Sequence, residues 1–232
     1  MKKRQVFGLV VAGLLAGFVS SAVAQSATAY SSTAVGVIKK TLPAGGRVLM
    51  SIPLDQASDS GEGFTFSSIP AIAALPNGSV AYFWDMDTQT WIAQPKTRGS
   101  WGSEKDRIIA VGEAFFLKNT QSTNIELIVS GEVPSDETLS KGISGDNARN
   151  LVANPYPVPT VLTNFDFASK VSNGSVVYFW DVDEQAWVAQ PKTRGSWGNE
   201  KNRSVAPGEG FFIKQTAEDV VWTESRPYTW PK

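Results

Sequence analysis

The chain has 232 residues, of which 42% are hydrophobic and 11% aromatic, and its formal net charge is −1. This composition is typical of a globular protein, and differs from that of a disordered chain or a dedicated nucleic-acid binder. The chain contains no Cys and no His. Their absence excludes disulfides, thiol nucleophiles, Ser-His-Asp and Cys-His catalysis, and metal sites built on thiolate or imidazole ligands.

Residues 1–24 have the pattern of a secretory signal peptide. The basic start Lys2-Lys3-Arg4 is followed by an apolar run over 6–19 and by the small-residue cleavage site Ala22-Val23-Ala24. The run is short and interrupted by glycines, which favours cleavage over an uncleaved membrane anchor. The mature chain would contain 18 basic and 22 acidic residues and no membrane span. We therefore expect a secreted, periplasmic or cell-surface protein without nucleic-acid partners.

An internal repeat organises the rest of the chain. Residues 77–119 return as residues 173–215, with 30 of the 43 aligned positions identical at a constant offset of 96. This similarity predicts a tandem duplication, with β-repeat unit 1 at 25–134 and β-repeat unit 2 at 135–232. The short polar segment that joins the units favours packed neighbours over independently tumbling domains.

Each unit is predicted to be all-β, because short runs rich in branched and aromatic residues are bounded by Gly, Pro, Asn or Asp. In the first unit these runs are 35–42, 47–53, 79–85, 90–95, 113–118 and 124–133, and the second unit repeats them. Helices are restricted to short segments at 67–74 and 162–170. The expected architecture is two tandem homologous β-sandwich or barrel-like units packed together.

The repeated segment begins with a predicted hairpin. The strand 79–85 is apolar on both faces, so it should be central and covered. Residues 85–89 supply a tight polar turn, and Trp91 opens the return strand. Asn77-Gly78 precedes the hairpin and is interpreted as a turn, although Asn77-Gly78-Ser79 also matches a glycosylation acceptor. Equivalent residues occur 96 positions later.

Taken together, these motifs resemble a group of uncharacterised secreted bacterial proteins built from a duplicated β-unit with YFWD and PGEGFF-type motifs. The residues that carry the resemblance are 34–37, 42–45, 49–53, 82–85, 112–116, 130–134 and 207–212. The resemblance implies export and the repeated architecture. It implies no catalytic or binding residue.

The longest identity between the copies is 93–102 against 189–198. Its Arg-Gly-Ser-Trp loops can present an aromatic platform to a sugar ring, with Arg and Gln donating hydrogen bonds to hydroxyl groups. The alternative is that both tryptophans fold over the sheet and both arginines pair with carboxylates. The candidate ligand-binding residues are Gln94, Arg98, Trp101, Gln190, Arg194 and Trp197.

The acidic motifs also allow two interpretations. Asp85-x-Asp87 and Asp181-x-Asp183 can supply oxygen ligands to Ca²⁺, but turn-capping carboxylates are favoured because too few further ligands follow. Asp85 with Glu113, or Asp181 with Glu209, can be written as the carboxylate pair of a glycosidase. We expect neither a metal nor a catalytic site.

Two glycines shared by the copies are expected to adopt a structural role. Gly112 and Gly208 precede strands that carry paired phenylalanines, and a turn with positive φ or a close backbone approach is expected there. Ala114 stands where Gly210 does, so that position is expected to need neither. The neighbouring Phe residues are core candidates.

The leading hypothesis is an exported, non-enzymatic structural or interaction protein of the cell surface or extracellular space, without a cofactor. The first alternative is a carbohydrate-binding protein that uses the two Arg-Gly-Ser-Trp loops, whose equivalent sites would add avidity. The second is a hydrolase with paired carboxylates. The partner would be a glycan or a surface protein, and the sequence leaves the oligomeric state open.

Overall fold

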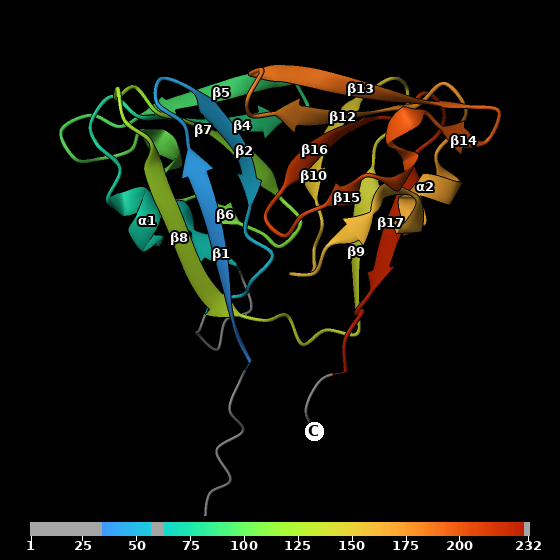
Figure 1. Ribbon diagram of the computed structural model, residues 1–232, viewed down its shortest axis with the longest axis horizontal. Helices are drawn as coiled ribbons and strands as arrows, with labels where there is room; N and C mark the ends of the chain where they lie inside the picture. The colour runs from blue at the N-terminus through green and yellow to red at the C-terminus, as the bar shows by residue number, and fades with distance from the viewer. Residues whose placement is uncertain (1–33, 57–62, 230–232) are drawn as a thin grey trace, which may run out of the picture. The chain divides into compact units, whose positions relative to one another are not determined.

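The computed structural model describes residues 34–56 and 63–229, all within the compact unit Thr33–Lys232 (Figure 1). The predicted signal peptide lies outside the described residues. The fold is all-β, as predicted, and its two α-helices are each one turn long: α1 (Pro70–Ala73) and α2 (Asp166–Lys170). Each follows a 3₁₀ turn inside the segment in which a short helix was expected. No helix in the described ranges is long and apolar enough to cross a membrane.

The first half, residues 34–134, contains a four-stranded antiparallel sheet in the order β2-β7-β4-β5. Two strand pairs, β1 with β8 and β3 with β6, complete this half. The strands are β1 (Val35–Leu42), β2 (Arg47–Ser51), β3 (Phe64–Thr65), β4 (Val80–Asp85), β5 (Thr90–Pro95), β6 (Ile108–Ile109), β7 (Ala114–Lys118) and β8 (Ile125–Glu132).

The second half, residues 135–229, has the sheet order β10-β16-β12-β13-β14, with β9 paired to β17 and β11 to β15. Its strands are β9 (Thr138–Ile143), β10 (Arg149–Ala153), β11 (Thr160–Val161), β12 (Val176–Asp181), β13 (Ala186–Thr193), β14 (Ser196–Trp197), β15 (Ser204–Val205), β16 (Gly210–Lys214) and β17 (Val220–Ser225). The β4–β5 register returns in β12–β13 at the offset of 96. Homology of the two halves stays a prediction from the sequence repeat.

Alternation along the strands places a separate apolar core in each half. In the first sheet, Phe83 and Phe115 point away from the second half and pack with Phe66, with ring centroids 5.0–5.9 Å apart. Phe179 and Phe211 occupy the corresponding core of the second sheet. Figure 1 shows the β1–β8 pair in one half and the β9–β17 pair in the other, each extending below the sheet of its half.

The opposite face of each sheet packs against the other half, and we call these two surfaces the junction faces. Their contact forms a third cluster centred on Phe116 and Phe212, to which both halves contribute. Phe116 packs edge-on against Trp180 at 4.8 Å, and Phe212 against Trp84 at 4.9 Å. Such edge-to-face pairs contribute about 0.5–1.5 kcal/mol each beyond their burial. The predicted packing of strand 79–85 on both faces therefore comes from the neighbouring half.

Hydrogen bonds across the junction are reciprocal. The Trp84 indole Nε1 donates to the Arg149 carbonyl at 2.8 Å, and Trp180 Nε1 donates to the Arg47 carbonyl at 3.3 Å. Gln89 and Gln185, both with positive φ at the hairpin turns, accept from the Arg149 and Arg47 amides at 2.7 Å. Each hairpin therefore anchors itself to the first residue of a strand in the other half.

The glycine prediction is confirmed at Gly112 and Gly208, whose φ angles are 78° and 74°. At Gly210 the expected absence of a positive φ is confirmed, but the expectation that this position needs no close approach was wrong. A Cβ at this position would lie 2.5 Å from the Cβ of Ala114, because the two equivalent residues meet across the junction. One of the pair has to be glycine, although neither residue adopts a positive φ.

Candidate functional site

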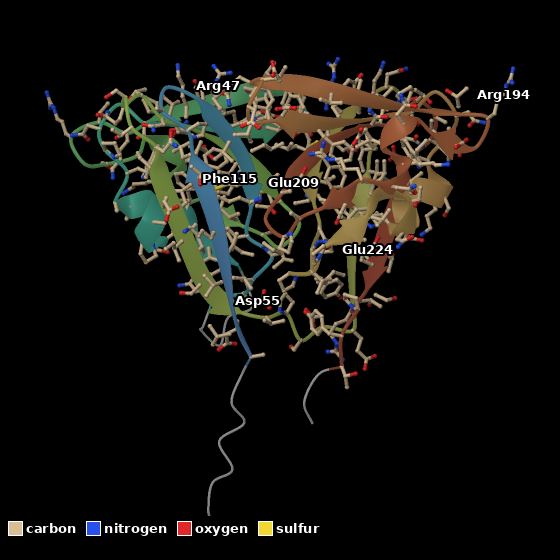
Figure 2. All side chains as sticks on the ribbon, in the orientation of Figure 1. Arg47, Asp55, Phe115, Arg194, Glu209 and Glu224 are labelled. Carbon is tan, nitrogen blue, oxygen red and sulfur yellow. The ribbon has the colours of Figure 1, made fainter. Side chains whose placement is uncertain are left out.

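The Arg-Gly-Ser-Trp loops are tight turns with exposed arginines at their tips. Thr97 and Ser100 exchange both backbone hydrogen bonds, at 2.9 and 3.0 Å. Arg98 and the following glycine have φ angles of 51° and 80°, the backbone of a type I′ turn. Arg194 stands at the corresponding tip in the second half (Figure 2). Neither arginine forms an ion pair with any described residue, so the expected carboxylate pairing is wrong.

The two loop tryptophans are buried. Trp101 is 4% exposed and packs edge-on against Phe66 at 5.1 Å, while Trp197 is 5% exposed and donates to the Ala168 carbonyl at 3.2 Å. Neither ring has a free face for stacking on a sugar. The predicted partners Gln94 and Gln190 are also buried. The six predicted ligand-binding residues therefore do not gather around one accessible surface.

Two buried lysines explain part of the identity between these loops. The Lys192 ammonium donates to the carbonyls of Ala168, Ser169 and Val171 at 2.8–3.2 Å, where α2 ends. Lys96 does the same after α1, at 2.5 and 2.7 Å. Burial lowers the pKa of both ammonium groups. Sequence reasoning missed this role, because a lysine in a loop rich in Pro and Gly is typical of an exposed position.

The repeated aspartates cap their own turns, as favoured. Asp85 Oδ1 accepts from the amides of Asp87 and Thr88 at 2.9 and 3.1 Å, and Asp181 makes the equivalent pair of bonds. Hydrogen bonds from Thr88 lower the pKa of the Asp85 carboxyl. The described ranges contain no group of three acidic side chains placed to hold a metal ion.

The carboxylates proposed for hydrolysis are engaged in structural contacts. Arg107 Nη2 donates to Glu113 Oε1 at 2.8 Å, and the amide of Ala110 lies 3.3 Å from Oε2. Arg203 and Glu209 repeat this pair at 2.6 Å. Both glutamates therefore anchor the turn before a sheet strand. Glu113 lines a cavity of about 190 Å³, and Glu209 lines one of about 360 Å³ together with Asp181, but each glutamate is paired with an arginine there.

A cavity of about 560 Å³ lies in the second half, and Asp166 and Glu224 line it. Burial raises the pKa of Glu224, whereas hydrogen bonds from Lys170 and Thr223 outweigh burial and hold the pKa of Asp166 low. Divergent pKa values in one cavity are typical of an acid–base pair. Here both carboxylates bind backbone amides that fasten α2 to β17, at 2.8 and 2.9 Å. This structural role accounts for them.

A smaller cavity of about 260 Å³ lies where the junction faces meet, and we call it the aromatic groove. Both halves supply its lining, which consists of Trp84, Trp91, Arg149, Tyr178, Trp187 and Phe212. Trp187 is 36% exposed, the most exposed tryptophan in the described part of the chain, and Trp91 and Tyr178 are half-buried. These rings provide the accessible aromatic surface that Trp101 and Trp197 do not.

The groove is rigidly supported from below. Phe212 lies under both tryptophans, with ring centroids 5.7 Å from Trp91 and 5.1 Å from Trp187. Trp84 packs edge-on against Trp91 at 5.1 Å, and its indole nitrogen is held by the Arg149 carbonyl. The Arg149 side chain is exposed at the edge and pairs with no carboxylate among the described residues. The sequence signal that could have indicated this aromatic surface was the recurrence of Tyr, Trp and Trp along each hairpin.

Comparison with known proteins adds no relationship. No protein-family model matches the chain, and neither a curated protein nor a solved structure is significantly similar to it. The resemblance to secreted bacterial proteins with a duplicated β-unit stays a prediction from the motifs. The candidate site therefore depends on its own geometry.

Proposed function

We propose that this chain is a non-enzymatic glycan-binding protein that acts outside the cytoplasm, at the cell surface or in the extracellular space. Its binding site is the aromatic groove, and the buried loop tryptophans are part of the scaffold. The observation that carries the proposal is the pair of accessible rings, Trp91 and Trp187, next to the guanidinium of Arg149, which forms no ion pair with a described residue.

The chemistry of the groove suits a sugar ring. The apolar C–H face of a pyranose packs on an indole, while its hydroxyl groups need polar donors at the edge of the stack. Arg149 supplies up to five N–H donors in a fixed plane, and the Tyr178 hydroxyl can both donate and accept. A volume of about 260 Å³ is below the ~300–1,000 Å³ typical of pockets for drug-sized ligands. The groove therefore accepts one sugar ring of a longer chain that continues outside it.

A binding role agrees with the distribution of chemical groups. The chain has no His or Cys, and the carboxylates considered for hydrolysis are bound to Arg107, Arg203 or to backbone amides. The signal-peptide pattern at 1–24 supports export.

The test is affinity electrophoresis of the mature protein in gels that contain neutral or acidic polysaccharides. We expect retardation that is lost in Trp187→Ala and kept in Ile108→Ala, which removes a similarly exposed apolar side chain outside the groove. Near-ultraviolet circular dichroism establishes that both variants are folded. Mobility unchanged in every gel, or equal retardation of folded Trp187→Ala, contradicts the proposal.

A second candidate is a structural or protein-interaction role, favoured by apolar side chains on the outer face of the β1–β8 pair. Val35, Val37 and Ile128 are 70%, 62% and 54% exposed. If the protein self-associates through this face, a Val37→Lys, Ile128→Lys double variant should have a lower mass in sedimentation analysis than the unmodified protein. A monomeric unmodified protein contradicts this candidate.

A further inference from the structure

The charged residues that the described strands place on the junction faces are all cationic. In the first sheet, Arg47 and Lys118 are cross-strand partners on the same face as Leu49, Phe116 and Tyr82. In the second sheet, Arg149 and Lys214 occupy the equivalent register positions. Within the described strands of the two sheets, no Asp or Glu alternates onto these faces. This is unexpected for a chain with a net charge of −1.

Each of the two arginines lies beside an aromatic ring of the junction faces. Arg149 lines the aromatic groove beside Tyr178 and Trp187. The guanidinium of Arg47 lies 5.2 Å from the ring centroid of Tyr82, the residue equivalent to Tyr178. Both arginines are exposed, and the hairpin of the other half binds only their backbone groups. Figure 2 shows Arg47 at the upper edge of the molecule. Their charges are therefore available to a ligand.

We propose that the natural ligand is an anionic polysaccharide, with a carboxylate- or sulfate-bearing sugar ring stacked in the aromatic groove. This inference rests on the proposed function and names its ligand class. Arg149 binds the anionic group of the ring in the groove. Arg47 and Lys118 bind an anionic group further along the same chain.

Arginine is suited to this role because its planar guanidinium binds a carboxylate or sulfate through two parallel N–H bonds. A neutral glycan would use the same rings but would make no charge-assisted bond to the four cations, whose described strands place no acidic residue on these faces.

A single-stranded nucleic acid also combines bases for stacking with negative charge. The sequence pI of about 5.6 argues against it, because nucleic-acid-binding domains carry an extended basic surface. The polysaccharide is therefore favoured.

The test measures dissociation constants by affinity electrophoresis at low ionic strength. Carboxymethylcellulose and hydroxyethylcellulose share one backbone and differ in charge, and polygalacturonate, alginate, dextran and dextran sulfate widen the comparison. An oligothymidylate competes in a separate arm. The key variant is Arg47→Gln with Arg149→Gln. Its matched control is Arg98→Gln with Arg194→Gln, which removes the same charge from the exposed loop tips.

We expect at least one acidic polysaccharide to bind. The junction double variant should weaken that binding by about tenfold or more, as expected for the loss of charge-assisted bonds. The control should retain it within about twofold, because exposed charges far from the ligand are screened by salt.

If neutral and acidic polysaccharides bind equally well, and Trp187→Ala abolishes the binding of both, the inference of an anionic ligand is overturned and the proposed function is retained. Absence of binding to every polysaccharide would overturn both. Equal weakening in the two arginine variants, or tighter binding of the oligothymidylate, would overturn the inference.

Discussion

The contact between Gly210 and Ala114 provides a direct test of the junction that builds the groove. A methyl group at position 210 would meet the Ala114 Cβ at 2.5 Å and the Leu49 Cγ at 3.1 Å. Ordinary contacts between carbon atoms are about 3.5–4.0 Å, so the two halves would have to separate by roughly 1 Å at this point. Overpacking of a close-packed interior costs about 1–3 kcal/mol.

We therefore expect Gly210→Ala to lower the free energy of unfolding by about 1–3 kcal/mol. For a chain of this size the melting temperature should fall by about 2–4 °C for each kcal/mol. Ala114→Gly alone should cost about 1 kcal/mol through the lost methyl burial and the added flexibility of the unfolded chain. Urea unfolding at one temperature measures both changes.

The decisive measurement is the double variant Ala114→Gly, Gly210→Ala. It moves the single methyl group to the other side of the junction, so its stability should return to within about 1 kcal/mol of the unmodified protein. An additive loss in the double variant would mean that the two residues do not share this space. The junction geometry, and with it the aromatic groove, would then be wrong.

Two further predictions concern buried titratable groups. Lys192→Met should lower the free energy of unfolding by about 2–3 kcal/mol, because three carbonyls at the end of α2 lose a charged donor. The control Lys201→Met, at an exposed position of a 3₁₀ turn, should have little effect. Urea unfolding compares the two variants, and equal stability would contradict the role assigned to Lys192. Burial raises the pKa of Glu224, so the folded state holds this proton more tightly, and the stability that the proton confers is lost as pH rises from the unfolded pKa through the raised folded pKa. The Glu224→Gln variant cannot lose this proton. The difference in melting temperature, variant minus unmodified protein, should therefore be more positive at about pH 7 than at about pH 4. A difference that does not change with pH would contradict a raised pKa at Glu224.

Much of the fold could be predicted from local pattern alone. Alternating aromatic and branched residues placed β4, β5 and β7 within one residue of their observed bounds. The turn after Asp85 followed from the preference of Asp for turns whose backbone amides its side chain caps, whereas the positive φ of 54° at Gln89 was not predicted. Two-residue strands such as β3 and β6 were missed, since a pattern of period two needs several residues to be recognised.

The candidate site could not be predicted in the same way, because it depends on contacts between distant residues. Trp84 and Arg149 are separated by 65 positions, and Gln185 and Arg47 by 138. No local periodicity indicates which half will cover an apolar face. The longest identity between the copies drew attention to Trp101 and Trp197, but burial of these rings and of Lys96 and Lys192 serves the individual cores.

The groove follows from an incomplete match between two large apolar faces. Each sheet packs one face on its own core. Its second face is also apolar and would be exposed if the half stood alone. Pairing of the two halves buries Phe116, Phe212 and Trp180 on these second faces. Trp91 and Trp187 lie at the edge, where neither half covers them completely. A ligand that stacks on them contacts both halves, so it binds the paired state more tightly than a state in which the junction is open. Binding should therefore stabilise the junction itself, by an amount set by ligand concentration and affinity.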